Sequence, residues 1–486
     1  MTGLVAAVVA LLVTVAVAGT DAWRTAVAHG WLDDGYHRLV RDAFWHRFDR
    51  TAPIALGALV VLALLSAAFR RALPTRQTLA RPALLVAATL LARAAAFAYD
   101  GLPPYRPNVV LVSIDTLRAD RLGTYGSKRP TSPVLDRRLA AEGVVFEQAF
   151  SHSPKTTPSH MTMLTSLYES VHGVGLWARE AAPVLNPRVH TLAEILKNAG
   201  YATAAFTAGA HMHRERGFVQ GFDAYKHGEQ LHRALTFLDA HQRRPFFLFF
   251  HTYEVHDPYV PPAAVADSLA ADPVPAISEA VARIRAGVSG WGKAHKVFWG
   301  AVDAGDPRAV RYVSDLYDAG IAQMDGTTLP ALLDRLDALG LADDTLVIFT
   351  SDHGEAFQEH GRFLHDDLAP ETLHVPLVVR LPGRLPAGRR VREPVGLVDL
   401  LPTVLDLLSL PVPAQAQGRS LVALATAAGA AAPAVVVGEY PNPPGRRDES
   451  ARTASLTLVR EGGALALFDR VADPGEHHAL GSDAAA

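Results

Sequence analysis

The sequence of 486 residues contains no cysteine. This absence excludes disulfide bonds, thiolate metal ligands and a cysteine nucleophile together. An excess of positive charge is also missing, because 46 basic residues stand against 49 acidic ones and the net charge is -3. The sequence therefore offers no basic surface of the kind that binds nucleic acid, and we expect no nucleic-acid partner.

Apolar residues, by contrast, make up 49% of the chain, and their longest uninterrupted runs lie in the first hundred residues. Residues 3–19, 52–69 and 82–99 approach the ~20 apolar residues with which a helix crosses a bilayer. The third run contains Arg93, which costs roughly 2.5–3.5 kcal/mol at the centre of a span. We therefore predict a membrane anchor in residues 1–104 with two or three transmembrane helices. For residues 3–19 a cleaved signal peptide is the alternative.

Arginines set the orientation that we expect for this anchor. Four of them crowd the short link between the second and third runs: Arg70, Arg71, Arg76 and Arg81. By the positive-inside rule this link favours the cytoplasm, so three spans would place the remainder of the chain outside. The sequence thus predicts a multi-pass protein of the cell membrane, in contact with membrane lipid, whose large remainder lies on the outer (extracytoplasmic) face.

After Pro104 the pattern changes to short apolar runs that alternate with amphipathic segments. The runs are rich in β-branched and aromatic residues, as in strands buried on both faces. They cover residues 108–114, 143–150, 202–207, 246–251, 345–350 and 375–380. Helical periodicity covers residues 132–142, 192–199 and 313–339. This alternation predicts an α/β fold, with a mixed, mostly parallel central sheet flanked by helices.

Polar side chains stand where three of the predicted strands end. Asp115 follows the first run, His251 ends the fourth, and the adjacent Asp352 and His353 follow the fifth. A lone aspartate after a strand is most often a turn or cap residue. Here, however, several metal-type ligands fall on one edge of a sheet, where α/β proteins bind their ligands.

A threonine pair precedes another helical segment. Pro158 suits the first turn of a helix, and Thr156 or Thr157 the position just before it. A hydroxyl there faces free backbone N–H groups and the positive end of the helix dipole, which favours an anion or an alkoxide. From this segment alone an ordinary helix cap is the simpler interpretation, and a nucleophile is the alternative.

Several motifs then follow in a fixed order, from Val-Ser-Ile-Asp ending at Asp115 to Ser-Asp-His-Gly-Glu ending at Glu355. The full set is 106–120, 132–136, 140–143, 155–165, 245–259, 345–355, 360–361, 374–377, 399–406 and 473–476. Together they resemble the sulfatase family of the alkaline-phosphatase superfamily. The resemblance implies an alkaline-phosphatase-like catalytic domain in residues 105–430 and a small antiparallel C-terminal subdomain in residues 431–486.

The resemblance also implies a site. A metal ion would be bound by Asp115, Asp352 and His353. Thr156 would be both the covalent nucleophile and a further metal ligand, and His256 would contact the transferred anion. Weaker candidates for contacts to the substrate, each with a structural role as the alternative, are His160, His251 and His365.

Departures from the family are equally informative. Sulfatases place Cys or Ser at the Thr156 position, later converted to formylglycine, and Arg at the His160 position. Threonine cannot undergo that conversion, so no formylglycine is expected, and the usual pair of aspartates is reduced to Asp115-Thr116. The site resembles the threonine branch of the superfamily, which includes lipoteichoic-acid synthase-like and phosphoethanolamine-transferase-like enzymes.

The expected chemistry is a double displacement. Thr156 attacks a phosphate or sulfate ester, and water or an acceptor alcohol releases the covalent intermediate, which gives hydrolysis or phospho-group transfer. Carboxylate, imidazole and alkoxide ligands suit one Mn²⁺ or Zn²⁺ ion better than Ca²⁺ or Mg²⁺. The ester would belong to a lipid headgroup, a glycan or an envelope polymer. A true sulfuric ester hydrolase, or a non-catalytic binding protein on the same fold, is the alternative.

Residues 263–308 predict a helical insertion into the catalytic domain. Trp291 and Trp299 within it are available to cover the site or to touch lipid. A packed pair of surface helices is the alternative.

Overall fold

The computed structural model describes residues 106–175, 183–209, 211–228, 230–288, 290–426, 435–441 and 447–481. The apolar runs of the predicted anchor in residues 1–104 lie outside them. No helix within the described ranges is long and apolar enough to cross a membrane, and the longest, α12 (Pro307–Gln323), is an amphipathic helix of 17 residues. The predicted multi-pass membrane localisation is corrected to this extent: the described residues give it no support.

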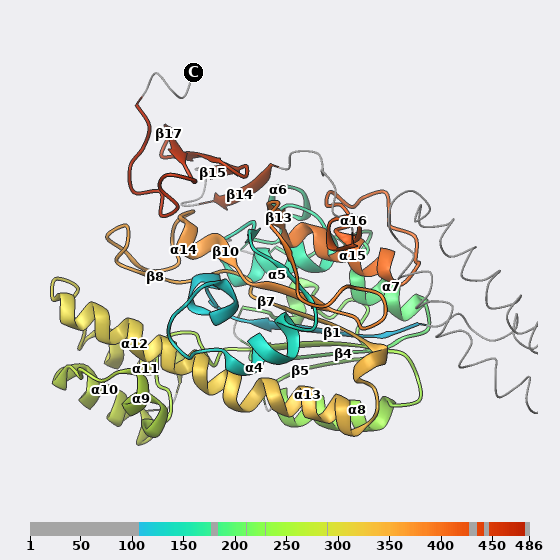
Figure 1. The fold of residues 1–486 in the computed structure, drawn as a ribbon, viewed down its shortest axis with the longest axis horizontal. Coiled ribbons are helices and arrows are strands. Elements are labelled where there is room, and N and C mark those ends of the chain that lie inside the picture. The colour runs from blue at the N-terminus through green and yellow to red at the C-terminus, as the bar shows by residue number, and fades with distance from the viewer. Residues whose placement is uncertain are drawn as a thin grey trace, which may run out of the picture. The chain divides into compact units, whose positions relative to one another are not determined.

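An eight-stranded sheet forms the centre of the fold, in the order β12-β2-β11-β7-β1-β6-β4-β5 (Figure 1). The strands are β1 (Asn108–Ile114), β2 (Val144–Phe146), β4 (Ala202–Thr207), β5 (Ala224–His227), β6 (Phe246–Thr252), β7 (Thr345–Thr350), β11 (Leu377–Arg380) and β12 (Arg389–Val391). Strand β1 pairs in parallel with both β6 and β7, whereas β11 is antiparallel to β7 and β2. The predicted mixed, mostly parallel sheet is confirmed.

Two predicted strands are divided. The run at 143–150 splits into β2 and β3 (Ala149–Phe150), and β3 joins β10 (His374–Val375) and β13 (Val395–Gly396) in a separate sheet. The run at 375–380 breaks at Pro376, whose missing N–H cannot donate to a strand ladder. Strand β5 escaped prediction because its four residues at the sheet edge are half exposed and lack a continuous apolar run.

Helices cover both faces of the sheet (Figure 1). On one face lie α5 (Thr156–Thr165), α7 (Leu192–Asn198), α15 (Leu400–Leu407) and α16 (Val422–Thr426). On the other lie α4 (Pro133–Leu135), α8 (Gln230–His241), α12 and α13 (Leu329–Ala338). Strand β1 serves both cores, because Val109 and Leu111 pack on the first face and Val110 and Val112 on the second.

The predicted insertion at 263–308 is helical, with α9 (Ala263–Leu269), α10 (Pro275–Arg285) and α11 (Trp291–Trp299). Residues Ile277, Val281 and Phe298 of these helices are buried in the second core, so the insertion is packed onto the domain rather than loosely attached.

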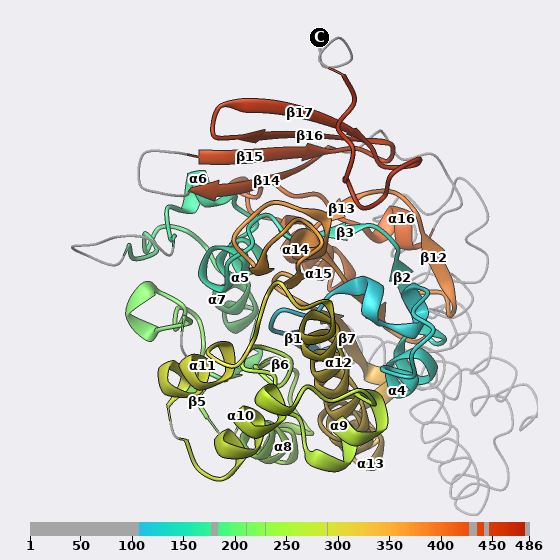
Figure 2. The same cartoon turned by 90° about the vertical axis from the view of Figure 1, so that its left-hand side faces the viewer.

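Four antiparallel strands form a small C-terminal sheet, β14 (Val436–Pro441), β15 (Arg447–Arg452), β16 (Leu456–Glu461) and β17 (Ala464–Asp469) (Figure 2). Buried Arg452 holds the sheet to the catalytic domain by donating to the backbone oxygen of Leu368, and within the subdomain it also donates to Glu476. Val436 and Tyr440 add apolar contacts to Phe150 and Leu373. The predicted antiparallel C-terminal sheet is confirmed, whereas the domain boundaries at 104 and 430 lie outside the described residues.

Two carboxylates approach each other where α6 (Glu169–His172) meets β14. Glu169 is buried, and one of its oxygens has no hydrogen-bond partner among the described residues. Burial, with the charge of Glu439 nearby, raises the pKa of Glu169 to about 8. The folded chain therefore keeps a proton that the unfolded chain has already released at neutral pH.

We expect Glu169→Gln to remove a pH dependence of stability. The contribution of neutral Glu169 is fully present below the ordinary carboxyl pKa and is lost as pH rises through about 8. Glutamine mimics the neutral carboxyl at every pH, so the variant should match the wild type at pH 5 and melt higher at pH 8. Each kcal/mol in the free energy of unfolding corresponds to about 2–4 °C in the melting temperature.

Thermal unfolding at both pH values, at one scan rate, measures this difference. Glu279→Gln, which changes an exposed glutamate, is the control and should follow the wild type throughout. Equal melting temperatures for Glu169→Gln and the wild type at pH 8 would show that Glu169 is not held neutral.

Candidate active site

Strand ends and one helix N-terminus meet at a single edge of the central sheet. Asp115 follows β1, His251 lies near the end of β6, and Asp352 and His353 follow β7. Because β1 pairs in parallel with both neighbours, these ends lie at the same level. Thr156 begins α5, whose ten residues are all buried. The side chains that the sequence singled out are thus brought together.

Two carboxylates of this group each have one oxygen without a hydrogen-bond partner among the described residues. Oδ1 of Asp115 and Oδ2 of Asp352 are buried and accept no hydrogen bond from any described residue. Burial, and then the charge of Asp115, raises the pKa of Asp352 to about 8. Burial also raises the pKa of Asp115 to about 6, although the charge of His256 opposes it. Two unpaired, mutually repelling carboxylate oxygens are the environment that a bound cation satisfies.

The Nε2 lone pair of His353 lies close to the unpartnered oxygen of Asp352. Its Nδ1–H donates to the backbone oxygen of Gly354 at 3.0 Å, which leaves Nε2 unprotonated. Nε2 lies 3.4 Å from Oδ2 of Asp352 and 3.4 Å from Oγ1 of Thr156. A backbone carbonyl that fixes the tautomer in this way is typical of metal-binding histidines.

The ligand atoms of Asp115, Asp352 and His353 lie within 4.8 Å of one another. The backbone N–H groups of His353 and Thr116 hold Oδ1 of Asp352 at 3.0 and 3.3 Å, so Oδ2 is the oxygen left for a ligand. The donor set therefore fits one divalent cation, with Thr156 as a fourth ligand.

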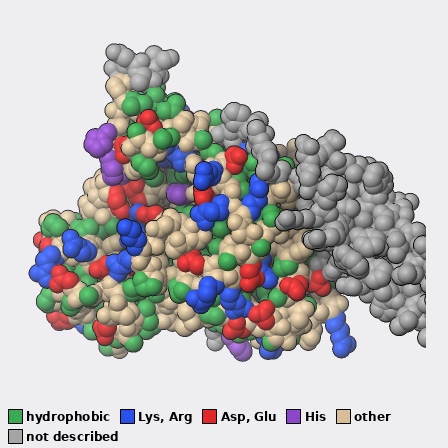
Figure 3. All heavy atoms as spheres, viewed as in Figure 1, with side chains coloured by type: hydrophobic (Ala, Val, Ile, Leu, Met, Phe, Trp, Pro, Cys, Tyr) green, Lys and Arg blue, Asp and Glu red, His purple; other side chains and the backbone are tan. Residues whose placement is uncertain are grey.

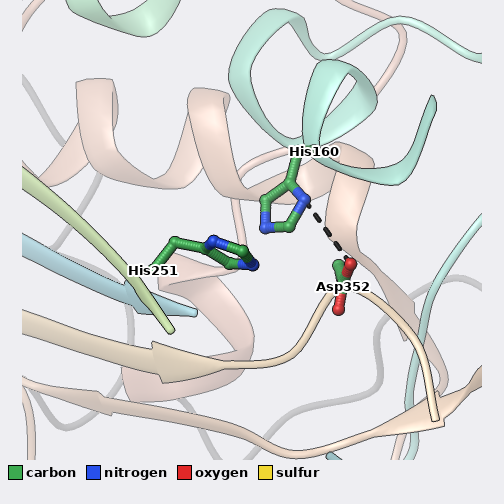
Figure 4. Close-up of side chains that lie close together, drawn as sticks. All are labelled: His160, His251 and Asp352. Atoms are coloured by element: carbon green, nitrogen blue, oxygen red, sulfur yellow. Dashed lines mark ion pairs between the residues drawn. The ribbon is translucent and has the colours of Figure 1, made fainter. Parts of the chain in front are cut away.

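His160, His251 and Asp352 form a second cluster with the same spacing (Figure 4). Here the ring nitrogens already have partners. Nδ1–H of His160 donates to the backbone oxygen of Thr156 at 2.9 Å and lies 3.5 Å from Asp352, and its Nε2 accepts from Ser113 at 2.9 Å. A metal bound at this second cluster would have to break these hydrogen bonds.

His251 fixes the orientation of Asp115. The backbone N–H of Ala208 donates to Nδ1 of His251 at 3.4 Å, so Nε2–H donates to Oδ2 of Asp115 at 3.0 Å. Burial lowers the pKa of His251 to about 3 and that of His160 to about 4, which keeps both rings neutral. The geometry supports an orienting role for both histidines, and their predicted contact with substrate stays a prediction.

Two further histidines and a lysine lie close to the cluster. Nε2 of His256 is 3.8 Å from Oδ1 of Asp115. Burial alone would lower the pKa of His256, but its hydrogen bond to Asp257 and the neighbouring carboxylates raise it to about 10. The ring of His365 lies 4.3 Å from that of His353, and Lys155, the residue before α5, forms an ion pair with Asp366 at 2.5 Å.

Figure 3 shows the surface hollowed between the C-terminal sheet and the body of the domain, with histidine and charged side chains around the hollow. His256 and His365 are only partly buried, unlike the fully buried carboxylates and His353. Of these groups, the two outer histidines are thus the ones that solvent reaches.

Two further residues of the site were missed from the sequence. The ring of Tyr253 lies 5.0 Å from that of His251 and 4.9 Å from that of His256. Burial, with the charges of Asp115 and Asp352, raises its pKa and keeps the phenol a neutral donor. Glu355 is also buried, and neither of its carboxyl oxygens has a partner among the described residues.

Comparison with known proteins shows which family the sequence matches. The model of the family described as Sulfatase matches residues 107–410, and that of the N-sulphoglucosamine sulphohydrolase C-terminal region matches residues 358–485. The ulvan-active sulfatase of Formosa agariphila is 29% identical over 423 residues, which cover 78% of this chain and 77% of that protein. The N-acetylglucosamine-6-O-sulfatase of Bacteroides thetaiotaomicron is 22% identical over 399 residues, covering 65% and 70%.

Among solved structures, the phosphonate monoester hydrolase of Agrobacterium radiobacter superposes with a TM-score of 0.62 at 23% identity. The match covers 78% of this chain and 92% of that chain. At this identity the likeness shows the fold, which is the alkaline-phosphatase-like fold predicted from the sequence.

We expect Asp352→Asn to lose divalent-metal binding, because the change removes one of the two unpaired carboxylate charges. His251→Ala should weaken binding roughly 10–100-fold, since it only frees the carboxylate of Asp115 to rotate. Calorimetric titration of metal-stripped protein with Mn²⁺, Zn²⁺, Ca²⁺ and Mg²⁺ measures both effects. His232→Ala, at an exposed histidine, is the control. Undiminished binding by Asp352→Asn would place the metal elsewhere.

Proposed function

The chain belongs to the sulfatase family and is a hydrolase of that family, and from this premise we propose that it cleaves the ester of a tetrahedral oxyanion with Thr156 as the attacking group. One observation carries the proposal: Oγ1 of Thr156 lies at the N-terminus of α5, 3.4 Å from the unprotonated nitrogen of His353 and beside unpaired carboxylates. The prediction of an enzyme is confirmed by the family.

Asp115, Asp352, His353 and Thr156 are the residues that would hold one divalent cation. When bound, such an ion lowers the pKa of a coordinated hydroxyl and offsets negative charge on the ester oxygens. Two carboxylates, one imidazole and one hydroxyl suit Mn²⁺ or Zn²⁺ better than Ca²⁺ or Mg²⁺.

The reaction that these residues support has two displacements. Oγ of Thr156 attacks the sulfur or phosphorus, the bond to the leaving oxygen breaks, and the hydroxyl proton leaves with the departing alcohol. Water then attacks the threonine ester, which restores the hydroxyl and releases the inorganic anion or acid. The free N–H groups at the start of α5 and the cationic His256 favour the anionic group in both steps.

Sulfate esters are the substrate class that the relatives favour. Two of them are sulfatases by name, and one name specifies N-acetylglucosamine. We therefore place the sulfate ester of a sugar first. This order reverses the one predicted from the sequence alone, which put phosphate esters before a true sulfuric ester hydrolase.

A phosphate or phosphonate ester is the second candidate, and Thr156 is the observation that favours it. Threonine cannot be converted to formylglycine, so a covalent intermediate on this residue must be released by attack on the sulfur or phosphorus itself. The proposed threonine branch of the superfamily has this chemistry with phosphorus. An acceptor alcohol in place of water would turn either reaction into group transfer.

We expect Thr156→Ala to lose turnover roughly a thousandfold or more, because the variant lacks the hydroxyl that is proposed to form the covalent ester. Thr156→Ser, which keeps the hydroxyl, should retain measurable turnover. Nitrophenyl sulfate, a phosphate diester and a phosphonate ester, each assayed with Mn²⁺ and Zn²⁺, are the substrates. Thr157→Ala is the matched control, since the hydroxyl of Thr157 donates to the backbone oxygen of His211 at 2.7 Å.

The substrate turned over fastest by the wild type decides between sulfate and phosphorus esters. Mass spectrometry of peptides from protein quenched during turnover locates the intermediate on Thr156 in either case. Wild-type rates for Thr156→Ala on every ester that the wild type turns over would show that Thr156 has only a structural role in the first turn of α5.

A further inference from the structure

One face of helix α11 is tied to the residue beside His256. Trp291, His295 and Trp299 recur every four residues and therefore lie on the same side of the helix, which is labelled in Figure 2. All three donate to Asp257. Trp291 reaches the backbone oxygen at 3.1 Å, whereas His295 and Trp299 both reach Oδ2 of the carboxylate, at 2.5 and 3.1 Å.

The other oxygen of Asp257 belongs to the site. Oδ1 lies 3.1 Å from Nδ1 of His256, which also donates to the backbone oxygen of Asp257 at 2.8 Å. Nε2 of the same ring points toward Oδ1 of Asp115, 3.8 Å away. The Asp257 carboxylate thus bridges two histidines, one in the insertion and one beside the cluster of unpaired carboxylates.

These donors hold Asp257 ionised inside the protein. The residue is only 4% exposed, and a buried carboxylate is costly unless several donors satisfy it. Burial alone would raise the pKa of Asp257, but the hydrogen bond and charge of His256, with the hydrogen bonds of His295 and Trp299, bring it below its usual range. Removing a donor leaves a poorly satisfied carboxylate that is free to turn.

We propose that His295 is a positioning residue, which through Asp257 fixes the ring of His256 toward the anion of the bound ester. The proposal rests on the proposed function, in which His256 contacts that anion. It gives the helical insertion a part in the reaction beyond the packed surface helices that were the alternative from the sequence.

Packing and positioning by α11 can be separated. Phe298 is fully buried in the core and Ala294 is also buried, so the helix is held by apolar contacts on a face adjacent to His295. His295 itself is 28% exposed and adds little to that packing. Substitutions at His295 are therefore expected to fold.

His295→Ala and His295→Asn form the test pair. The side-chain amide nitrogen of asparagine occupies nearly the position of Nδ1 in histidine and can still donate to Asp257. On the ester that the wild type turns over, His295→Ala should lower kcat/KM roughly 10–100-fold, as outer partners of functional groups do. His295→Asn should stay within about threefold of the wild type, and Lys296→Ala, at an exposed position of α11, should be unchanged.

A binding measurement without turnover accompanies the kinetics. Calorimetric titration of the metal-loaded proteins with orthovanadate, a tetrahedral oxyanion, reports the anion contact directly. His256→Ala and His295→Ala should both weaken vanadate binding, and His295→Asn should preserve it. Melting temperatures and metal affinity should stay close to wild type in both His295 variants.

Equal losses in His295→Ala and His295→Asn, or vanadate binding by His295→Ala at wild-type affinity, would overturn the proposal. A loss of kcat/KM that is accompanied in each variant by a proportionate fall in melting temperature would also overturn it, because destabilisation would then explain the loss. Wild-type turnover by Thr156→Ala would instead refute the proposed nucleophile, and the vanadate series would still decide the role of His295.

Discussion

The mutual repulsion of two buried carboxylate oxygens, on Asp115 and Asp352, is the constraint around which the rest of the site is arranged. Each carboxylate is held by its other oxygen: Asp115 through His251, and Asp352 through the backbone N–H groups that follow β1 and β7. The two remaining oxygens face a common point without donors. Folding therefore raises the pKa of Asp352 to about 8, so that a proton relieves the repulsion where a cation could later do so.

The histidines around the two carboxylates differ in their protonation state. Behind the carboxylates, burial keeps His160 and His251 neutral, so their nitrogens can fix geometry without adding charge. In front of them, His256 is paired with Asp257 and stays cationic, which suits a group that meets an anion. The same residue type thus serves two purposes: His160 and His251 are fully buried, whereas His256 hydrogen-bonds to Asp257 and lies among several carboxylate charges.

Family membership favours a sulfate ester as substrate, whereas the identity of residue 156 favours a phosphorus ester. The relatives are sulfatases by name, whereas the resemblance to the family implies that Thr156 stands at the position that matures to formylglycine. A threonine ester must be opened at sulfur or phosphorus, so the second displacement depends on how well the site holds the anion while water attacks. The groups that orient His256 therefore matter for the proposed second step. They are Asp257 and, in the helical insertion, His295.

The sequence by itself determined the α/β class, most strand positions and the convergence of Asp115, Thr156, Asp352 and His353. It could do so because strand ends and helix starts are local features, and parallel pairing carries them to one edge. It predicted a membrane localisation for which the described residues offer no span, and it ranked the substrate classes differently from the relatives. Only the tertiary structure showed that His251 orients Asp115, that Tyr253 lies at the site and that α11 reaches Asp257. The reason is that contacts between residues distant in sequence leave no periodic pattern to detect.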